Sequence, residues 1–307
     1  MKQSAHFNKF YNHHVKLDQQ RIKRLKKHIV SVSSFLKKSI LASRIVSIQA
    51  QGSWRHGTMI QPLPKKEYDA DILVILQPNT RWRVSDYMDT FHATFKRCPS
   101  YAGMVSRKTR CITLDYKGDF HLDVVPCVVW RESEWLIFNK EVYFVCNRKD
   151  GRFERTDGDG FALWLEEKKS IVPGANLSKV IQLLKYLRDH KQNFSVKSIL
   201  LTTLIGNCIK NTERGTDFAD LPTSLQTVLS RLDKYLASHT KVPIIVNPAY
   251  KVENFNRNWE EVNFQNFKRC IHSLRLRVDD AINERSRNLS LQKWQSIFGP
   301  QFGADDR

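Results

Sequence analysis

Two aspartates, Asp69 and Asp71, open an apolar segment that runs to residue 76. In an extended strand, side chains two apart point to the same face, so the two carboxylates lie together while the intervening side chains are buried. A third aspartate, Asp123, directly precedes a second apolar run. If the two strands are neighbours, three carboxylates converge, and carboxylate oxygens are preferred ligands of Mg²⁺. Two such ions about 4 Å apart can activate an attacking hydroxyl and stabilise a pyrophosphate leaving group.

A Gly-Ser pair, Gly52 and Ser53, stands upstream of these aspartates. A tight turn at this pair can hold phosphate oxygens with its backbone N–H groups and the serine hydroxyl. An isolated Asp-x-Asp at a strand start is usually a solvated or capping pair, and an isolated Gly-Ser pair says even less. The order of turn, Asp-x-Asp on one apolar run and a single Asp on another favours a metal-dependent site for a nucleoside triphosphate.

The elements around these residues predict an α+β fold. Strands are expected at 44–50, leading into the Gly-Ser turn, and at 69–76, with a short helix between them and a helix at 87–98. Residues 111–116 and 119–130 read as a hairpin across Lys117 and Gly118. Residues 151–160 are rich in Gly, Asp and Arg and predict a loop that separates two lobes. Helical patterns follow at 161–169, 178–191, 195–210, 224–238 and 263–287. We therefore expect a mixed-sheet lobe at 1–160 and a helical lobe at 161–307.

The N-terminal segment concentrates the positive charge of the chain. The formal net charge is +19, and residues 1–50 hold eleven Lys or Arg and one acidic residue, Asp18. Within residues 19–39, apolar side chains recur at helical spacing: Ile22, Leu25, Ile29, Val32 and Leu36. Basic residues fall largely on the other faces, which predicts a long amphipathic helix with a basic surface. Such a surface can contact nucleic acid non-specifically, and a merely solvated helix face gives the same pattern.

Composition restricts the class of protein. At 307 residues with 41% hydrophobic residues, the chain can bury a sizeable core in one large or two closely packed domains. No apolar run approaches the roughly 18 residues that a membrane span needs, and the first residues lack the apolar core of a signal peptide. The six cysteines are scattered without a C-x-x-C pair. These features predict a reduced cytoplasmic protein without a zinc site or membrane contact, and we expect a monomer.

Beyond these physical arguments, the motifs resemble a known superfamily. The pattern G-S-x-x-x-G-T-x-I at residues 52–60, then D-A-D-I-L-V-I and D-F-H-L-D-V-V-P, resembles the DNA polymerase β-like nucleotidyltransferases. Within it, the chain looks like the bacterial cyclic GMP–AMP synthase/DncV-like nucleotidyltransferases, the CD-NTases of antiphage signalling systems. Segments 7–17, 177–190, 242–259 and 291–302 are similar to further parts of that family, so the resemblance covers nearly the whole chain. It implies a polymerase β-like lobe plus a helical second lobe, braced by a long N-terminal helix.

The resemblance also implies roles for individual residues. The catalytic and metal-binding set would be Asp69, Asp71 and Asp123, holding two Mg²⁺ ions for which Mn²⁺ can substitute. The nucleotide-binding set would be Gln51, Gly52, Ser53, Lys185 and Ser198. The chain departs from the family pattern in two places. Related animal enzymes often have Tyr directly after the serine that corresponds to Ser198, whereas this chain has Ile199, so no base-stacking residue is assigned. The spacing from Ser53 to Asp69 is also long for the superfamily.

The implied activity is the joining of NTPs into a cyclic di- or trinucleotide second messenger with release of pyrophosphate, in antiphage defence. The product would activate a separate downstream effector. One alternative is a template-independent RNA nucleotidyltransferase that uses the same aspartates and clamps RNA with the basic helix. Another is a non-catalytic nucleic-acid-binding module, against which the presence of all three aspartates argues. The sequence does not specify the bases, the ring size, the linkage or the mode of activation.

Overall fold

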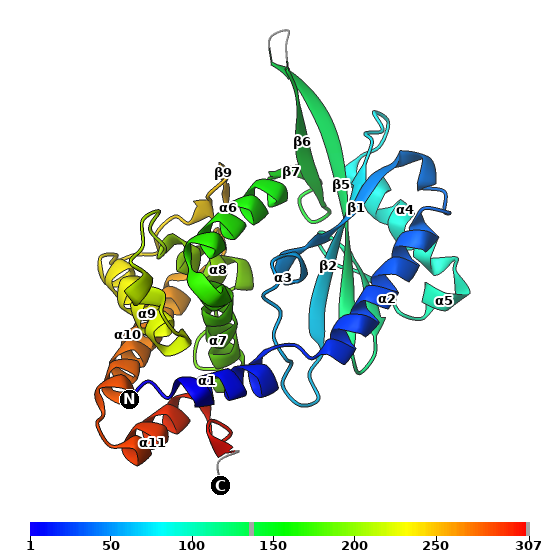
Figure 1. The fold of residues 1–307 in the computed structure, drawn as a ribbon. Coiled ribbons are helices and arrows are strands. Elements are labelled where there is room, and N and C mark those ends of the chain that lie inside the picture. The colour runs from blue at the N-terminus through cyan, green and yellow to red at the C-terminus, as the bar shows by residue number, and fades with distance from the viewer. Residues whose placement is uncertain (135–137, 305–307) are drawn as a thin grey trace. The chain divides into compact units, whose positions relative to one another are not determined.

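The computed structural model describes residues 1–134 and 138–304 (Figure 1). It divides into two compact units. The sheet unit comprises Leu17–His56 and Pro62–Asp159, and the helical unit comprises Met1–Lys16, Gly57–Gln61 and Gly160–Arg307. The change of unit at 159/160 lies one residue from the expected lobe boundary, whereas the first sixteen residues and a short segment after the Gly-Ser turn cluster with the helical unit.

The sheet unit is built on a seven-stranded mixed sheet in the order β1-β2-β5-β4-β3, with β6 pairing with β5 and β7 with β6. β2 and β5 are parallel, and the remaining pairs are antiparallel. The strands are β1 (Ile45–Gln51), β2 (Tyr68–Leu76), β3 (Val105–Arg107), β4 (Ile112–Tyr116), β5 (Phe120–Glu134), β6 (Phe138–Asn147) and β7 (Arg152–Thr156). The helices of this unit are α2 (Gln19–Leu36), α3 (Gly52–Arg55), α4 (Val84–Lys96) and α5 (Pro99–Ala102).

The expected strands and hairpin are confirmed, with one correction. Tyr116 pairs with Phe120 across the Lys117–Gly118 turn, as the hairpin prediction required. The loop expected at 151–160 is wrong, because residues 152–156 form β7 on the edge of β6 and α6 already begins at Gly158. Polar and basic residues are tolerated in β7 because it is an edge strand, so its sequence lacks the apolar signal of the central strands.

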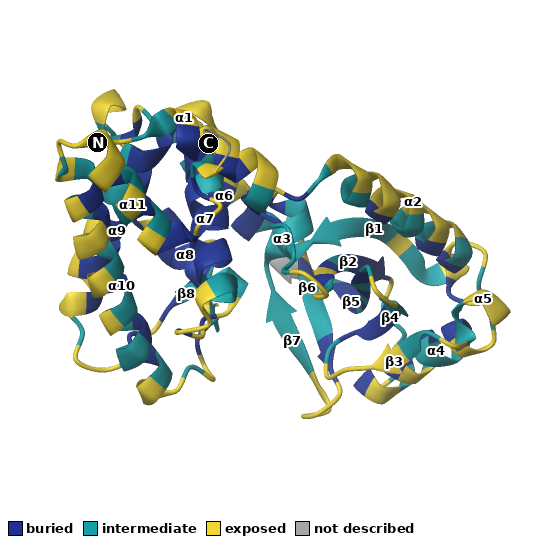
Figure 2. Cartoon of the chain, turned by 90° about the horizontal axis from the view of Figure 1, so that it is seen from below, coloured by how far each residue is buried: buried dark blue, intermediate teal, exposed yellow. Residues whose placement is uncertain are grey.

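Alternation along the central strands gives the sheet two different faces. On one face, the rings of Tyr68 and Tyr116 each stack on the ring of Phe120, and the His28 ring of α2 lies 4.3 Å from the Tyr116 ring between centroids. The opposite face carries the acidic residues near the start of β2. The predicted long helix is therefore confirmed as α2: it buries an apolar stripe and presents its basic side chains outward, seen as a largely exposed helix in Figure 2.

The helical unit surrounds one large apolar core. Its helices are α1 (Ser4–Phe10), α6 (Gly158–Ile171), α7 (Asn176–Lys191), α8 (Ser198–Asn207), α9 (Leu221–Ala237), α10 (Glu261–Asn283) and α11 (Arg287–Phe298), and α1 continues into a π-helical turn at Tyr11–Val15. A two-stranded hairpin, β8 (Val246–Asn247) and β9 (Tyr250–Asn254), completes it. α7 and α8 are mostly buried (Figure 2). α8 is apolar on nearly every side, whereas α7 also buries the polar side chains of Asn176, Gln182 and Lys185.

Aromatic packing explains why residues 1–16 belong to the helical unit and not to the sheet unit. Phe7 is fully buried, with its ring edge-on to Trp294 at 4.8 Å between centroids and in contact with Phe298 and Phe302. Phe10 joins the same cluster. Burying side chains of this size contributes about 2–3 kcal/mol each, so α1 is attached to α11 by far more than chain connectivity.

Candidate active site

Parallel pairing of β2 with β5 brings two of the predicted carboxylates together. Asp71 lies directly opposite Asp123 in the register, and Asp69 lies opposite His121. The condition for convergence of the carboxylates, that the two strands are neighbours, is therefore met. Asp123 is nearly buried, with 15% of its side chain exposed, whereas Asp69 is 71% exposed. The site thus runs from a sheltered end at Asp71 and Asp123 to an open end at Asp69.

The Gly-Ser turn lies directly against this sheltered end. β1 ends at Gln51, which pairs with Asp71, and the chain then turns sharply into the single-turn helix α3. Gly52 has a left-handed φ of 59°, and a Cβ atom built on it would lie 2.4 Å from Oδ2 of Asp71. Both the conformation and the contact require glycine. The backbone after β1 can approach the Asp71 carboxylate only because no side chain intervenes.

Crowding of carboxylates changes the protonation of Asp71. Burial, with the negative charges of Asp123 and Asp69 adding to it, raises the pKa of Asp71 to about 6. Beyond the carboxylates the same face turns apolar, with Leu73 and Ile75 packed into a small cluster with Cys127 and Val129. Hard, crowded oxygen donors of this kind suit a divalent cation, which would relieve the repulsion between them.

Asp123 has two partners that sequence reasoning missed. Lys108 Nζ lies 3.2 Å from both of its carboxylate oxygens, and Thr113 Oγ1 donates a hydrogen bond to Oδ1 at 2.5 Å. Thr113 could have been found from the predicted hairpin, because counting back from the Lys117–Gly118 turn places it opposite Asp123. Lys108 lies outside any strand and carries no comparable signal.

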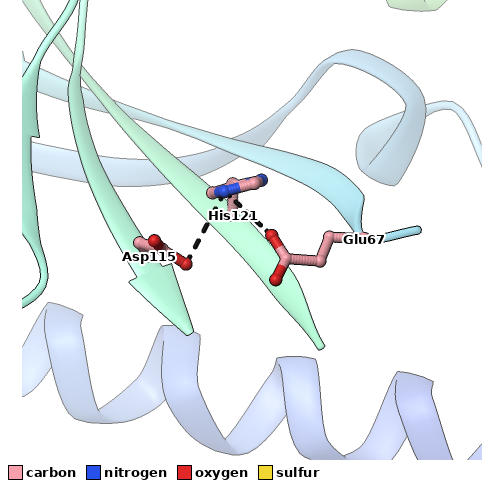
Figure 3. A group of neighbouring side chains, drawn as sticks. All are labelled: Glu67, Asp115 and His121. Carbon is pink, nitrogen blue, oxygen red and sulfur yellow. Dashed lines mark ion pairs between the residues drawn. The ribbon is translucent and has the colours of Figure 1, made fainter. Parts of the chain in front are cut away.

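A second cluster occupies the open end of the same face (Figure 3). Nε2 of His121 lies 2.9 Å from Glu67 Oε2 and 3.6 Å from Asp115 Oδ1, and its Nδ1 lies 3.6 Å from Asp69 Oδ1. Among the residues that the structure describes, the three candidate ligands with atoms all within 4.8 Å of one another are Glu67, Asp115 and His121, and not the three aspartates. This group could hold a metal ion. Counting residues back from the Lys117–Gly118 turn also predicts that Asp115 pairs with His121.

The turn residues beside Gly52 are anchored within the sheet unit. A Cβ atom built on Gly158 would lie 2.9 Å from Gln51 Nε2, so the side-chain amide of Gln51 packs against the start of α6. Arg55, at the end of α3, forms an ion pair with Asp159 in the same segment. Ser53 is the second residue of α3. These contacts fix the backbone on both sides of the turn.

The two expected phosphate-binding residues of the helical unit, Lys185 and Ser198, both lie near Arg188. Lys185 is 3% exposed and donates from Nζ to the carbonyl and the hydroxyl of Thr58, at 3.1 Å each. Burial, with the charge of Arg188 adding to it, lowers the pKa of Lys185 to about 7. Ser198, at the start of α8, accepts a 3.0 Å hydrogen bond from Arg188 Nη1. Thr58 follows the Gly-Ser turn closely in sequence, so Lys185 anchors the segment that comes after the turn.

A family model described as the Second Messenger Oligonucleotide or Dinucleotide Synthetase (SMODS) domain matches residues 1–169. The chain belongs to the SMODS family. Membership confirms the family and the nucleotidyltransferase class that the motifs predicted. It covers the whole sheet unit, including the Gly-Ser turn and all three aspartates.

The individual relatives that match this chain are less than 30% identical to it. The chain is 28% identical over 193 residues to a c-di-GMP synthase of Roseivirga ehrenbergii, covering 52% of this chain but 48% of that protein, so it spans about half the length of this relative. It is 23% identical over 278 residues to the cyclic AMP-AMP-AMP synthase of Escherichia coli MS 115-1, covering 82% of this chain and 81% of that one.

A solved structure extends the comparison to the fold of nearly the whole chain. The ATP complex of CdnC from the same E. coli strain matches with a TM-score of 0.77 at 20% identity, over 97% of this chain and 98% of that chain. This similarity confirms the predicted α+β nucleotidyltransferase fold. Within the described residues, no helix is both long enough and apolar enough to cross a membrane.

Proposed function

We propose that this SMODS protein joins nucleoside triphosphates into a cyclic di- or trinucleotide with release of pyrophosphate. The observation that carries the proposal is the register of Asp71 opposite Asp123, with the glycine turn in contact with the Asp71 carboxylate. This arrangement can hold an α-phosphate and its metal ions beside a polyphosphate-binding backbone. The named activities of the c-di-GMP and cyclic AMP-AMP-AMP synthases support the same reaction class.

The carboxylates are proposed to hold two Mg²⁺ ions, with Mn²⁺ as a substitute. Crowding around Asp71, which raises its pKa, is the property that fits a divalent cation to Asp69, Asp71 and Asp123. When bound there, the ions would activate the attacking ribose hydroxyl and neutralise charge on the leaving pyrophosphate. The chain itself contributes positioning: Thr113 orients Asp123, and Gly52 lets the backbone approach the reacting phosphate.

We propose that Gln51, Gly52, Ser53, Lys185 and Ser198 bind the donor triphosphate. The pKa of Lys185, lowered to about 7, suits a residue that becomes charged when it meets an anion. At the Thr58 contacts its Nζ atom is already oriented by two oxygen acceptors. A triphosphate would supply the negative charge that these neutral partners lack.

The cellular role is part of the same proposal. The product is proposed to activate a separate effector in antiphage defence, with the enzyme acting as a cytoplasmic monomer. All six cysteines are free, which supports a reducing compartment. The exposed lysines of α2 could also contact nucleic acid.

The test is a labelling assay with purified protein, Mg²⁺ and the four NTPs, each α-labelled in turn, followed by phosphatase treatment. A cyclic product has no terminal phosphate, so its label survives phosphatase and its identity names the bases. Asp123→Asn should abolish the product. Asp89→Asn is the matched control, because Asp89 is an exposed aspartate of α4 paired with Arg107.

Two outcomes would contradict the proposal. If wild-type label stays phosphatase-sensitive but lengthens added RNA, the protein is a template-independent RNA nucleotidyltransferase. If no pyrophosphate is released with or without nucleic acid, while nucleic acid binds with a steep dependence on salt, the protein is a binding module. Equal loss of product in Asp123→Asn and Asp89→Asn would indicate a folding defect rather than a catalytic one.

A further inference from the structure

The open end of the acidic face gathers side chains that the nucleotidyl-transfer reaction does not need. Glu67 immediately precedes β2, Asp115 lies in β4 and His121 lies in β5 (Figure 3). All three are partly buried, and they offer two carboxylates and one imidazole nitrogen within 4.8 Å of one another. Asp115 and His121 come from paired strands and Glu67 directly adjoins a third, so the sheet holds their backbones in place.

The spacing of the three donor atoms is close to that of a metal-ligand set. Oxygen and nitrogen ligands about 2.1 Å from a tetrahedral ion lie about 3.4 Å apart. His121 Nε2 is 3.6 Å from Asp115 Oδ1 and 2.9 Å from Glu67 Oε2, so small side-chain rotations would complete the geometry. A mixed set of one imidazole and two carboxylates selects a transition ion such as Zn²⁺ or Mn²⁺ over Mg²⁺, which takes oxygen ligands.

The surroundings of the cluster match what metal sites require. A metal-bound histidine usually presents its other ring nitrogen to a carboxylate, and here Nδ1 of His121 faces Asp69 Oδ1 at 3.6 Å. The second oxygen of Glu67 accepts a 2.6 Å hydrogen bond from the backbone N–H of Gly118, which orients its first oxygen toward His121. These contacts link the cluster to the active site through Asp69.

An independent observation is the state of Asp115. Its Oδ1 atom is buried from solvent and has no hydrogen-bond donor among the described residues, although it points at the imidazole. The Asp115 side chain as a whole is 38% exposed, but a carboxylate oxygen that is itself buried without a donor has lost its hydration without compensation. A cation between Asp115, Glu67 and His121 would satisfy it.

We propose that Glu67, Asp115 and His121 form a transition-metal site distinct from the two Mg²⁺ positions of the aspartate triad. The partial exposure of all three ligands leaves room for water in the remaining coordination positions. Because His121 also faces Asp69, an ion at this site would help to orient Asp69 through His121. The site is therefore a positioning site.

The test measures metal binding by itself and so does not depend on the proposed reaction. Co²⁺ replaces Zn²⁺ in such sites and reports imidazole coordination by its visible absorption. Co²⁺ is titrated into the Asp71→Asn/Asp123→Asn double variant, which lacks two of the three catalytic carboxylates, and competed with Zn²⁺ and with Mg²⁺. The same titration is repeated after adding His121→Asn, Glu67→Gln or Asp115→Asn, with His92→Asn as the matched control in α4.

We expect one Co²⁺ per chain in the double variant, displaced by Zn²⁺ but not by millimolar Mg²⁺. His121→Asn should remove it, Glu67→Gln and Asp115→Asn should each weaken it at least tenfold, and His92→Asn should leave it unchanged. Absence of Co²⁺ binding in the double variant, or binding that survives His121→Asn, overturns the proposal and means that ion pairs alone hold the cluster. If His121→Asn unfolds, the two carboxylate variants decide.

Discussion

Replacing Gly52 by alanine should disable the site with only a modest effect on folding. Two effects act at this position, backbone strain and a clash with Asp71, and a control variant separates them. The left-handed φ of 59° costs a non-glycine residue about 1–2 kcal/mol. The new methyl group would also sit 2.4 Å from Asp71 Oδ2, against an ordinary contact distance of about 3.4 Å, so the carboxylate must move by about 1 Å.

The size of the activity loss follows from that displacement. A misplacement of about 1 Å in a catalytic constellation costs about 100-fold in rate, which corresponds to about 2.7 kcal/mol of transition-state stabilisation. Gly151 supplies the matched control. It has a φ of 63° in the turn between β6 and β7 of the same unit, and a Cβ atom built there meets nothing within 4 Å. Gly151→Ala therefore carries the conformational cost alone.

The assay compares both variants with wild type by thermal unfolding and by initial rates of pyrophosphate release at saturating NTP and Mg²⁺. Both should lose similar stability, by about 1–2 kcal/mol, while the rate falls about 100-fold in Gly52→Ala and stays within twofold in Gly151→Ala. Equal rates in the two variants would refute the argument that the glycine turn approaches Asp71 for catalysis. A much larger stability loss in Gly52→Ala would mean that the methyl group disrupts the sheet instead.

Two further predictions concern pH and stability. Because the pKa of Asp71 is raised to about 6, the folded protein loses stability as pH rises from about 4 to about 6. In a chelator at pH 7.5, Asp71→Asn should therefore be inactive but more stable than wild type by up to about 3 kcal/mol. Denaturant unfolding that shows Asp71→Asn to be less stable than wild type would contradict this. For Lys185 the pH dependence of stability has the opposite sign, because its lowered pKa lets the unfolded state bind more protons than the folded state between about pH 7 and 10. Wild-type stability should rise across that range by up to about 1.4 kcal/mol per pH unit, and Lys185→Met should lack this rise. Parallel pH profiles of stability for the two proteins would show that Lys185 is not buried as described.

Some features of this protein depend on neighbours along the chain, and the sequence determined them. Alternation in a strand put Asp69 and Asp71 on one face, and the structure confirms it in the burial pattern of β2. The Lys117–Gly118 turn fixed the hairpin and, by counting, the residues opposite Asp123 and His121. The amphipathic pattern at 19–39 predicted α2, which spans Gln19–Leu36. The order of the motifs was enough for the family.

Only the tertiary structure decided how distant segments meet. The pairing of Asp71 with Asp123 depends on a parallel register between strands far apart in sequence, where a slip of one residue would turn one carboxylate to the other face. The contact of Gly52 with Asp71 and the cluster around His121 follow from that same register. Non-local packing also set the partner of Phe7, because an aromatic helix in isolation does not specify which core will bury it. Local spacing fixes which face a side chain takes, but the burial and proximity that make a site are properties of the assembled sheet and core.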